Sequence, residues 1–148
     1  MTSNSEFGSI SFDLPKNQSN VIKVIGVGGG GSNAINHMFK QGINGVDFIV
    51  CNTDSQALQN SSVPNKIQLG VNLTEGLGAG ANPDVGHQSA IESIGEIEKM
   101  LDSNTKMVFI TAGMGGGTGT GAAPVIAQLA KESDIIPEVP VTVPCRFE

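Results

Sequence analysis

Short apolar runs alternate with stretches of helical periodicity along this chain. Three runs are rich in β-branched residues and bounded by turn-forming residues, which is typical of strands buried in a parallel sheet. They predict strands over residues 21–25, 47–51 and 107–111, with a shorter strand over 66–69 and a helical turn over 55–58. Because helix-like stretches separate the strands, the pattern indicates an α/β fold, a parallel sheet with helices on both faces.

The first predicted helix follows the first strand and covers residues 34–41. Its apolar side chains fall on one side, Ser32 or Asn33 can serve as its N-cap, and Gly42 marks its end. Glycines at 26–31 lie between the strand and this helix. We therefore expect a glycine-rich loop there, in the strand–turn–helix context that phosphate-binding motifs require.

A longer helix is predicted over residues 83–101, with Asn82 as its N-cap and Pro83 at its first position. Its apolar residues recur at spacings of three and four, which predicts a buried face. That face consists of Ile91, Ile94, Ile97 and Leu101. A last helix runs to about Ser133, and Pro124 is tolerated only near its start.

The two ends of the chain are less regular. Residues 1–20 are rich in Ser and Asn and predict a flexible N-terminal tail. Residues 135–144 should form the next parallel strand, but Pro137, Glu138 and Pro140 fit poorly inside a central strand. We expect extended structure there without a regular strand.

Glycine is the compositional outlier, since 20 of the 148 residues are glycine, about twice the usual frequency of roughly 7%. Most of them lie in three clusters, at 26–31, 76–80 and 113–121, and each cluster precedes a predicted helix. Backbone N–H groups at a helix start bind anions, and glycine lets the backbone approach a ligand closely. Because ligands bind at the carboxyl ends of parallel strands, the clusters can converge on one polyphosphate nucleotide.

Composition narrows the choice of function. The net charge is −6 and no cluster of Lys and Arg exists, which argues against a nucleic-acid surface. No run of 18 apolar residues is present and residues 1–20 do not form a signal peptide, so no membrane insertion and a cytoplasmic location are expected. Cys51 and Cys145 suggest neither a disulfide framework nor a zinc site, and His37 and His87 lack partners at ligand spacing.

Three classes of nucleotide-binding protein compete. A Walker-A NTPase is nearly excluded, because neither main glycine loop contains a lysine. An NAD-binding Rossmann domain would use Gly26, Gly28 and Gly31 as its fingerprint and Asp54 at the ribose, although Asp54 is equally suited to initiate a turn. That class leaves residues 113–121 unexplained. In the third class both loops wrap the phosphates of a nucleoside triphosphate.

Four segments, taken together and in order, resemble the tubulin/FtsZ family of GTPases. They are residues 115–121 (GGGTGTG), 26–33, 52–58 and 76–83, and the match extends from Val21 to Lys131. The resemblance implies a Rossmann-like GTP-binding domain over residues 21–148. It also implies head-to-tail assembly with copies of itself into the cytokinetic ring at midcell, together with other cell-division proteins.

The resemblance further implies a site for GTP or GDP with Mg²⁺. Contacts to phosphates and ribose are implied for Gly29, Gly30, Gly31, Ser32 and Asn33, and the cradle of the β- and γ-phosphates for Gly116, Gly117, Thr118, Gly119 and Thr120. Ala79 and Gly80 would lie near the γ-phosphate, and Glu148 would bind the ribose. No residue of the chain is assigned as catalytic or as a metal ligand.

The family's central helix and its acidic catalytic loop, which acts on the neighbouring subunit's nucleotide, would lie beyond Glu148. We therefore expect a partial domain that holds GTP without hydrolysing it. Residues 133–147 also depart from the family pattern. Two functions stay open: the GTP-binding part of a self-assembling GTPase, or a truncated module that binds nucleotide or caps filaments.

Overall fold

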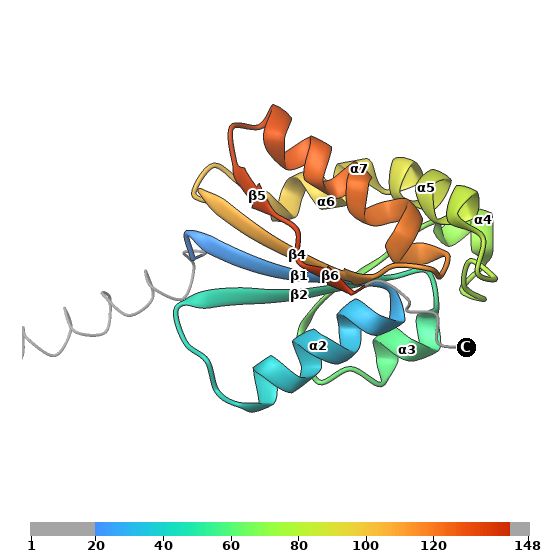
Figure 1. Ribbon diagram of the computed structural model, residues 1–148, viewed down its shortest axis with the longest axis horizontal. Coiled ribbons are helices and arrows are strands. Elements are labelled where there is room, and N and C mark those ends of the chain that lie inside the picture. The colour runs from blue at the N-terminus through green and yellow to red at the C-terminus, as the bar shows by residue number, and fades with distance from the viewer. Residues whose placement is uncertain (1–19, 143–148) are drawn as a thin grey trace, which may run out of the picture.

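A parallel sheet forms the centre of the molecule (Figure 1). The computed structural model describes residues 20–142. Every strand pairing among these residues is parallel. In spatial order the strands are β3 (Asn65–Gln68), β2 (Val46–Asn52), β1 (Ile22–Val27), β4 (Met107–Gly113) and β5 (Ile136–Glu138), and β6 (Val141–Thr142) also pairs with β4.

Helices cover both faces of this sheet, which confirms the predicted α/β fold (Figure 1). One face carries α2 (Gly28–Lys40) and α3 (Ser55–Gln59). The other face carries α4 (Val71–Thr74), α5 (Pro83–Glu92), α6 (Ile94–Met100) and α7 (Thr118–Glu132). None of the helices within residues 20–142 has the length and apolarity that crossing a bilayer demands.

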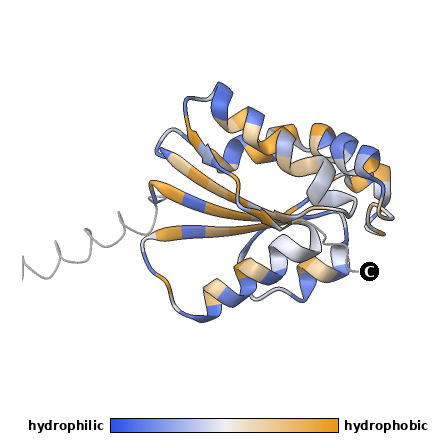
Figure 2. Ribbon diagram, viewed as in Figure 1, coloured by the Kyte–Doolittle hydropathy of each residue, from blue (hydrophilic) through white to orange (hydrophobic). Residues whose placement is uncertain are grey.

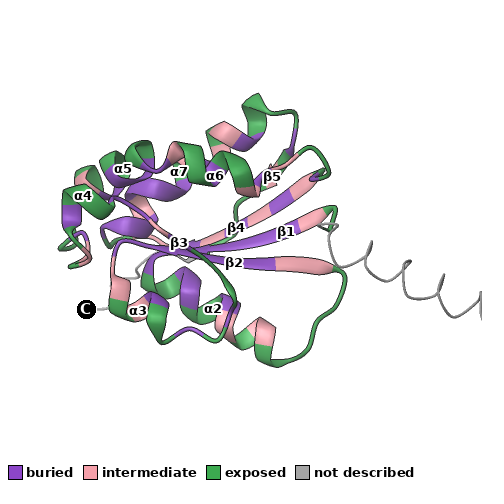
Figure 3. Cartoon of the chain, turned by 180° about the vertical axis from the view of Figure 1, so that it is seen from behind, coloured by how far each residue is buried: buried purple, intermediate pink, exposed green. Residues whose placement is uncertain are grey.

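Alternating side chains of the strands build two hydrophobic cores, one on each face. Ile25 of β1 and Ile110 of β4 pack with Ile126 of α7, whereas Val24 of β1 packs with Ile35 of α2. The central strands β2, β1 and β4 are accordingly mostly apolar, and the outer faces of the helices are largely polar (Figure 2). Figure 3 shows the same division, with buried residues concentrated in the central strands. The central strands are therefore packed on both faces and fix the positions of the segments at the edges of the sheet.

A buried ion pair joins β1 and β2 near their N-terminal ends. Lys23 is only 3% exposed and lies opposite Asp47 in the strand register, with Nζ 3.0 Å from Oδ2. Asn20 donates to the same carboxylate from its backbone and its side chain. Partial burial opposes the ionisation of Asp47, but the hydrogen bonds from Lys23 and Asn20 prevail and lower the pKa of this carboxyl.

The glycines after β1 are helical, contrary to the predicted loop. Helix α2 begins at Gly28, directly after the strand, and its N-cap position is Val27. Ser32 and Asn33 lie inside the helix, so the prediction that one of them caps it was wrong. The predicted end was right: Gly42, with a φ of 73°, follows the C-cap residue. Low helix propensity suggested a loop, but packing against the neighbouring helix start overrides it.

The predicted long helix over residues 83–101 is two helices, separated at Ser93. Its start is as predicted, since Asn82 accepts from Asp84 N and Pro83 occupies the first turn. Its buried face is confirmed at Ile97 and Leu101, which are 1% and 7% exposed, but not at Ile91, which is 43% exposed. Small residues of α5 face inward instead, since α5 packs so closely on α7 that only glycine fits at the crossing. These inward residues are Gly86, Ser89 and Ala90.

Two further expectations changed in detail. Helix α4 was not predicted, and Pro124 lies in the second turn of α7, beyond the helix start. Extended structure without a regular strand was expected for residues 135–144, and the described part is close to that, because β5 is only three residues long. It lies at the sheet edge, where a proline without an N–H group is tolerated. The predicted tail, apart from Asn20, and the candidate ribose ligand Glu148 lie outside the described residues.

Candidate functional site

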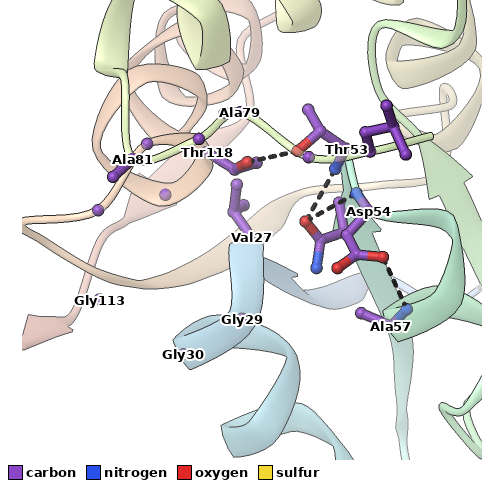
Figure 4. Close-up of a pocket in the computed structure, with 17 residues that line it drawn as sticks. Val27, Gly29, Gly30, Thr53, Asp54, Ala57, Ala79, Ala81, Gly113 and Thr118 are labelled. Atoms are coloured by element: carbon purple, nitrogen blue, oxygen red, sulfur yellow. Dashed lines mark hydrogen bonds between the residues drawn. The ribbon is translucent and has the colours of Figure 1, made fainter. Parts of the chain in front are cut away.

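A cavity of about 380 Å³ lies at the carboxyl edge of the central strands (Figure 4). The ends of β1, β2 and β4, the starts of α2 and α7, and the loop over residues 77–81 all contribute to it. Its lining consists of Val27, Gly29, Gly30, Asn52, Thr53, Asp54, Ala57, Leu77, Gly78, Ala79, Gly80, Ala81, Gly113, Gly116, Gly117, Thr118 and Gly119. All three glycine-rich segments therefore meet at one place, as the strand topology predicts.

The two long helices that open onto the cavity have no side-chain cap. The N-cap residues Val27 of α2 and Gly117 of α7 make no side-chain hydrogen bond to their helices. By contrast, Asp54 caps α3 and Asn82 caps α5. The first N–H groups of a helix have no partner inside it, so the uncapped starts of α2 and α7 present free donors and positive dipole ends. Helix starts of this kind are ready-made sites for anions in proteins.

Glycine allows these two helix starts to approach each other. A Cβ on Gly28 would lie 2.9 Å from the backbone nitrogen of Gly119, and the φ of Gly28 is +77°, a conformation that L side chains rarely adopt. Gly121 meets the backbone at Pro83 and His87 in the same way, which brings α5 against α7. These glycines are required by packing.

Other glycines of the same segments face open space. A Cβ placed on Gly29, Gly80 or Gly116 would meet nothing within 4 Å. All three line the cavity. At Gly80 the φ of +61° accounts for glycine. At Gly29 and Gly116 packing does not account for the absence of a side chain, and space for the close approach of a ligand is left.

A hydrogen bond between two buried hydroxyls joins the end of β2 to the start of α7. Thr53 Oγ1 and Thr118 Oγ1 are 2.7 Å apart (Figure 4). The two residues are 0% and 8% exposed. Asn52 Oδ1 fixes the same turn by accepting from the backbone of Thr53 and Asp54. Sequence reasoning missed Thr53. Its position could have indicated a role, because its hydroxyl lies at the carboxyl end of a predicted strand, next to Asp54.

The structural one of the two roles predicted for Asp54 is confirmed. Its Oδ1 accepts from the backbone nitrogens of Gln56 and Ala57, at 2.9 and 3.2 Å, and so caps α3. Figure 4 shows the bond to Ala57. Asp54 also lines the cavity, where it is the only ionisable side chain among the described lining residues. The positive field of the cavity therefore comes from backbone amides. Within residues 20–142 no group of three or more His, Cys, Asp or Glu could hold a metal ion.

Eight of the residues proposed from the sequence line the cavity. They are Gly29, Gly30, Ala79, Gly80, Gly116, Gly117, Thr118 and Gly119. They come from three separate segments, and the fold brings them together as the sequence pattern implies.

The remaining proposed residues lie outside this lining. Gly31 packs against the backbone at Thr111, and Asn33 is exposed on α2. Ser32 is buried, and its Oγ has no hydrogen-bond partner among the described residues. Thr120 Oγ1 accepts from Gly115 N at 2.8 Å, so this side chain supports the loop that precedes α7.

The fold and the site define a class of protein: an α/β domain with a parallel sheet that presents uncapped helix starts to an anionic ligand at its carboxyl edge. Comparison with known families then identifies the particular family. The model of the tubulin/FtsZ family, GTPase domain, matches residues 21–148, so the chain belongs to this family. The resemblance seen in the four sequence segments is confirmed.

Curated relatives agree with this assignment. The chain is 59% identical over 139 residues to the cell division protein FtsZ of Pseudomonas putida, an alignment that covers 93% of this chain and 35% of the relative. It is 59% identical over 127 residues to the cell division protein FtsZ of Aquifex aeolicus, covering 86% and 34%. The chain thus spans about a third of the length of the curated relatives it matches.

Solved structures show the same fold. An empty FtsZ dimer of M. jannaschii is 41% identical, with a TM-score of 0.81 and coverage of 94% of this chain and 40% of that one. A GTPγS-bound protofilament of CetZ2 from Haloferax volcanii is 29% identical, with a TM-score of 0.71 and coverage of 81% and 39%.

Proposed function

We propose that this chain is the GTP-binding part of a self-assembling GTPase of bacterial cell division. The observation that carries the proposal is the meeting of two uncapped helix starts, α2 and α7, at one cavity free of basic side chains among the described lining residues. Such a site is suited to several phosphate groups in series, because each helix start offers donors to a different phosphate. The protofilament relative is bound to GTPγS, which supports a guanosine triphosphate as the ligand.

Within this site the segment around α7 cradles the β- and γ-phosphates through the backbone of Gly116, Gly117, Thr118 and Gly119. Thr120 acts indirectly, by holding Gly115 in place. The start of α2 takes the other phosphates, and Ala79 and Gly80 close over the γ-phosphate. Gly31, Ser32 and Asn33 contribute through their place in the first turns of α2, and Glu148 is proposed at the ribose.

Magnesium would enter with the nucleotide. Mg²⁺ at phosphate sites is usually held by one or two carboxylates, phosphate oxygens and water. Asp54 is the one carboxylate among the described lining residues, and its Oδ1 already caps α3. We therefore assign most of the magnesium ligands to the phosphates and water. The ion would neutralise charge on the phosphates.

Hydrolysis, assembly and location are proposals for the whole protein. A general base or a water-positioning group must lie within hydrogen-bond reach of the attacking water. Asp54 is the one ionisable side chain among the described lining residues, and its Oδ1 caps α3. We propose that residues of a neighbouring subunit supply this group in a head-to-tail filament. The curated relatives are cell division proteins, and the solved relatives include a dimer and a protofilament. A cytoplasmic ring at midcell, with other division proteins as partners, is the corresponding setting.

A competition experiment tests the proposal. A fluorescent GTP analogue is bound to the chain and displaced by GTP, GDP, GMP and NAD in turn. We expect affinity to fall in the order GTP, GDP, GMP, because the cavity contacts phosphates, and NAD to compete poorly. Tight binding of NAD without binding of GTP would instead support the dinucleotide class. Phosphate release by the isolated chain above the level of a Gly116→Ala variant would contradict hydrolysis between subunits.

A further inference from the structure

Helix α4 is a single helical turn that precedes the cavity loop of residues 76–81. Both residues that flank it have left-handed backbone conformations, with φ of 61° at Gly70 and 53° at Glu75. Gly70 occupies its N-cap position and has no side chain to satisfy the first N–H groups. A helix this short cannot hold its own geometry in water. Something outside α4 must therefore stabilise it.

Glu92, the last residue of α5, supplies that support. Its Oε2 accepts from Asn72 N at 3.0 Å and its Oε1 accepts from Leu73 N at 3.2 Å. One carboxylate thus satisfies two of the unpaired donors of α4, and its negative charge suits the positive end of a helix. Hydrogen bonds to an ionised acceptor are the strong kind. This contact joins residues that are about twenty positions apart in the chain.

The far end of α4 connects directly to the cavity. Thr74 is buried and its Oγ1 contacts the backbone oxygen of Thr53 at 3.4 Å, while Leu77 N donates to Thr74 O at 3.0 Å. Ser55 N donates to Gly76 O at 3.1 Å. Thr53 is the residue whose hydroxyl reaches Thr118 at the start of α7. A shift of α4 would therefore move the loop that lines the cavity.

The loop contains one residue, Ala81, in a backbone conformation that its side chain disfavours. Gly76, Gly78, Gly80 and Ala81 all have positive φ, and Ala81 does so with a side chain. Its other end is fixed at Asn82, which caps α5. Residues 70–92 consequently form a closed circuit: α4, the loop, α5, and the Glu92 carboxylate that returns to α4.

We propose that Glu92 is a positioning residue for the nucleotide. By closing this circuit it holds residues 76–81 in the conformation that meets the terminal phosphate, although it does not touch the cavity itself. The inference rests on the proposed function, because it assigns the loop to the γ-phosphate of GTP. It predicts that loss of the carboxylate weakens GTP binding more than GDP binding.

The test compares Glu92→Gln with Glu98→Gln in the full chain. Glutamine keeps the size of Glu92 but offers one acceptor where two are used, and Glu98 is an exposed carboxylate of α6 whose loss changes the charge equally. Hydrogen exchange of the ligand-free chain is followed by mass spectrometry over residues 71–81. We expect faster exchange there in Glu92→Gln alone. Unchanged exchange would overturn the inference.

Nucleotide affinities provide the second measurement. In Glu92→Gln the affinity for a non-hydrolysable GTP analogue should fall about 5- to 30-fold, the effect of weakening one charge-assisted hydrogen bond, and the affinity for GDP should fall less. Glu92→Asp, which keeps both acceptors, should recover part of the loss. Equal losses for both nucleotides would indicate a merely structural role and overturn the proposal. A wild-type chain that binds no guanine nucleotide would refute the proposed function, whereas hydrogen exchange would still decide whether Glu92 holds the loop.

Discussion

Gly116 and Gly117 are neighbours in sequence, yet substitution by alanine should affect ligand binding at one and fold stability at the other. A Cβ on Gly116 would meet nothing within 4 Å, and the residue is exposed to the cavity. A Cβ on Gly117 would lie 2.7 Å from the nitrogen of Asn82 and 2.8 Å from the Cβ of Ala79. Gly116→Ala should therefore impair the ligand site alone, and Gly117→Ala should strain the fold.

The magnitudes follow from these distances. Gly116→Ala keeps a phosphate from at least one backbone donor, and a hydrogen bond to a charged group contributes about 1.5–3 kcal/mol, so affinity should fall about 10- to 100-fold. Its melting temperature should stay near that of the wild type. Gly117→Ala overpacks a tight contact at about 1–3 kcal/mol, which corresponds to a melting temperature lower by about 3–10 °C for a chain of this size.

Both quantities can be measured on the same samples, by titration with a fluorescent GTP analogue and by thermal unfolding without ligand. Gly95→Ala is the matched control, because a Cβ at Gly95 also meets open space and the residue lies in α6 away from the cavity. It should bind GTP normally and should not lower the melting temperature. Wild-type affinity in Gly116→Ala would refute the assignment of this glycine to the ligand, and an unchanged melting temperature in Gly117→Ala would refute the packing argument.

Three other substitutions or probes test the rest of the structure. Thr53→Val leaves the Thr118 hydroxyl buried without its partner, so chemical denaturation should show a loss of about 1–3 kcal/mol, in contrast to a surface threonine variant. Asp47→Asn should lower the free energy of unfolding by about 3 kcal/mol, the lower end for a broken buried pair because the Asp47 side chain is 24% exposed. Folding lowers the pKa of Asp47, so wild-type stability should fall as the pH drops through that pKa, below about pH 4. The variant should lack this pH-dependent component. Burial raises the pKa of the Cys51 thiol to about 12, so peptide mapping should find Cys51 unalkylated at neutral pH until the chain unfolds, and rapid labelling of the native chain would contradict its burial.

The strand and glycine pattern was sufficient to predict the architecture and the edge at which the site lies. Strands that are continuously apolar demand cover on both faces, and parallel strands place their following loops at one edge. The three glycine clusters that contain Gly29, Gly80 and Gly116 were expected at one edge on that basis, and the resemblance to the family then supplied the individual residues. Asn82 and Gly42 were recognised as helix ends because their chemistry is local.

Features that depend on packing between distant segments could not be predicted in this way. The start of α2 at Gly28 depends on its contact with Gly119, which no local propensity reports. The exposure of Ile91 depends on the close crossing of α5 and α7, which selects small residues for the buried side. Helix α4 depends on the carboxylate of Glu92, far along the chain. In each case a tertiary contact decided the structure.

The uncapped helix starts have a consequence for how binding responds to solution conditions. The described lining residues include no lysine, arginine or histidine, so the groups that attract the phosphates cannot lose a proton at any ordinary pH. The attraction that these backbone N–H groups exert on phosphates therefore does not change with pH. Between about pH 6 and pH 9, changes in affinity should therefore report the protonation of the nucleotide's own terminal phosphate, with a pKa of about 6 for phosphate esters.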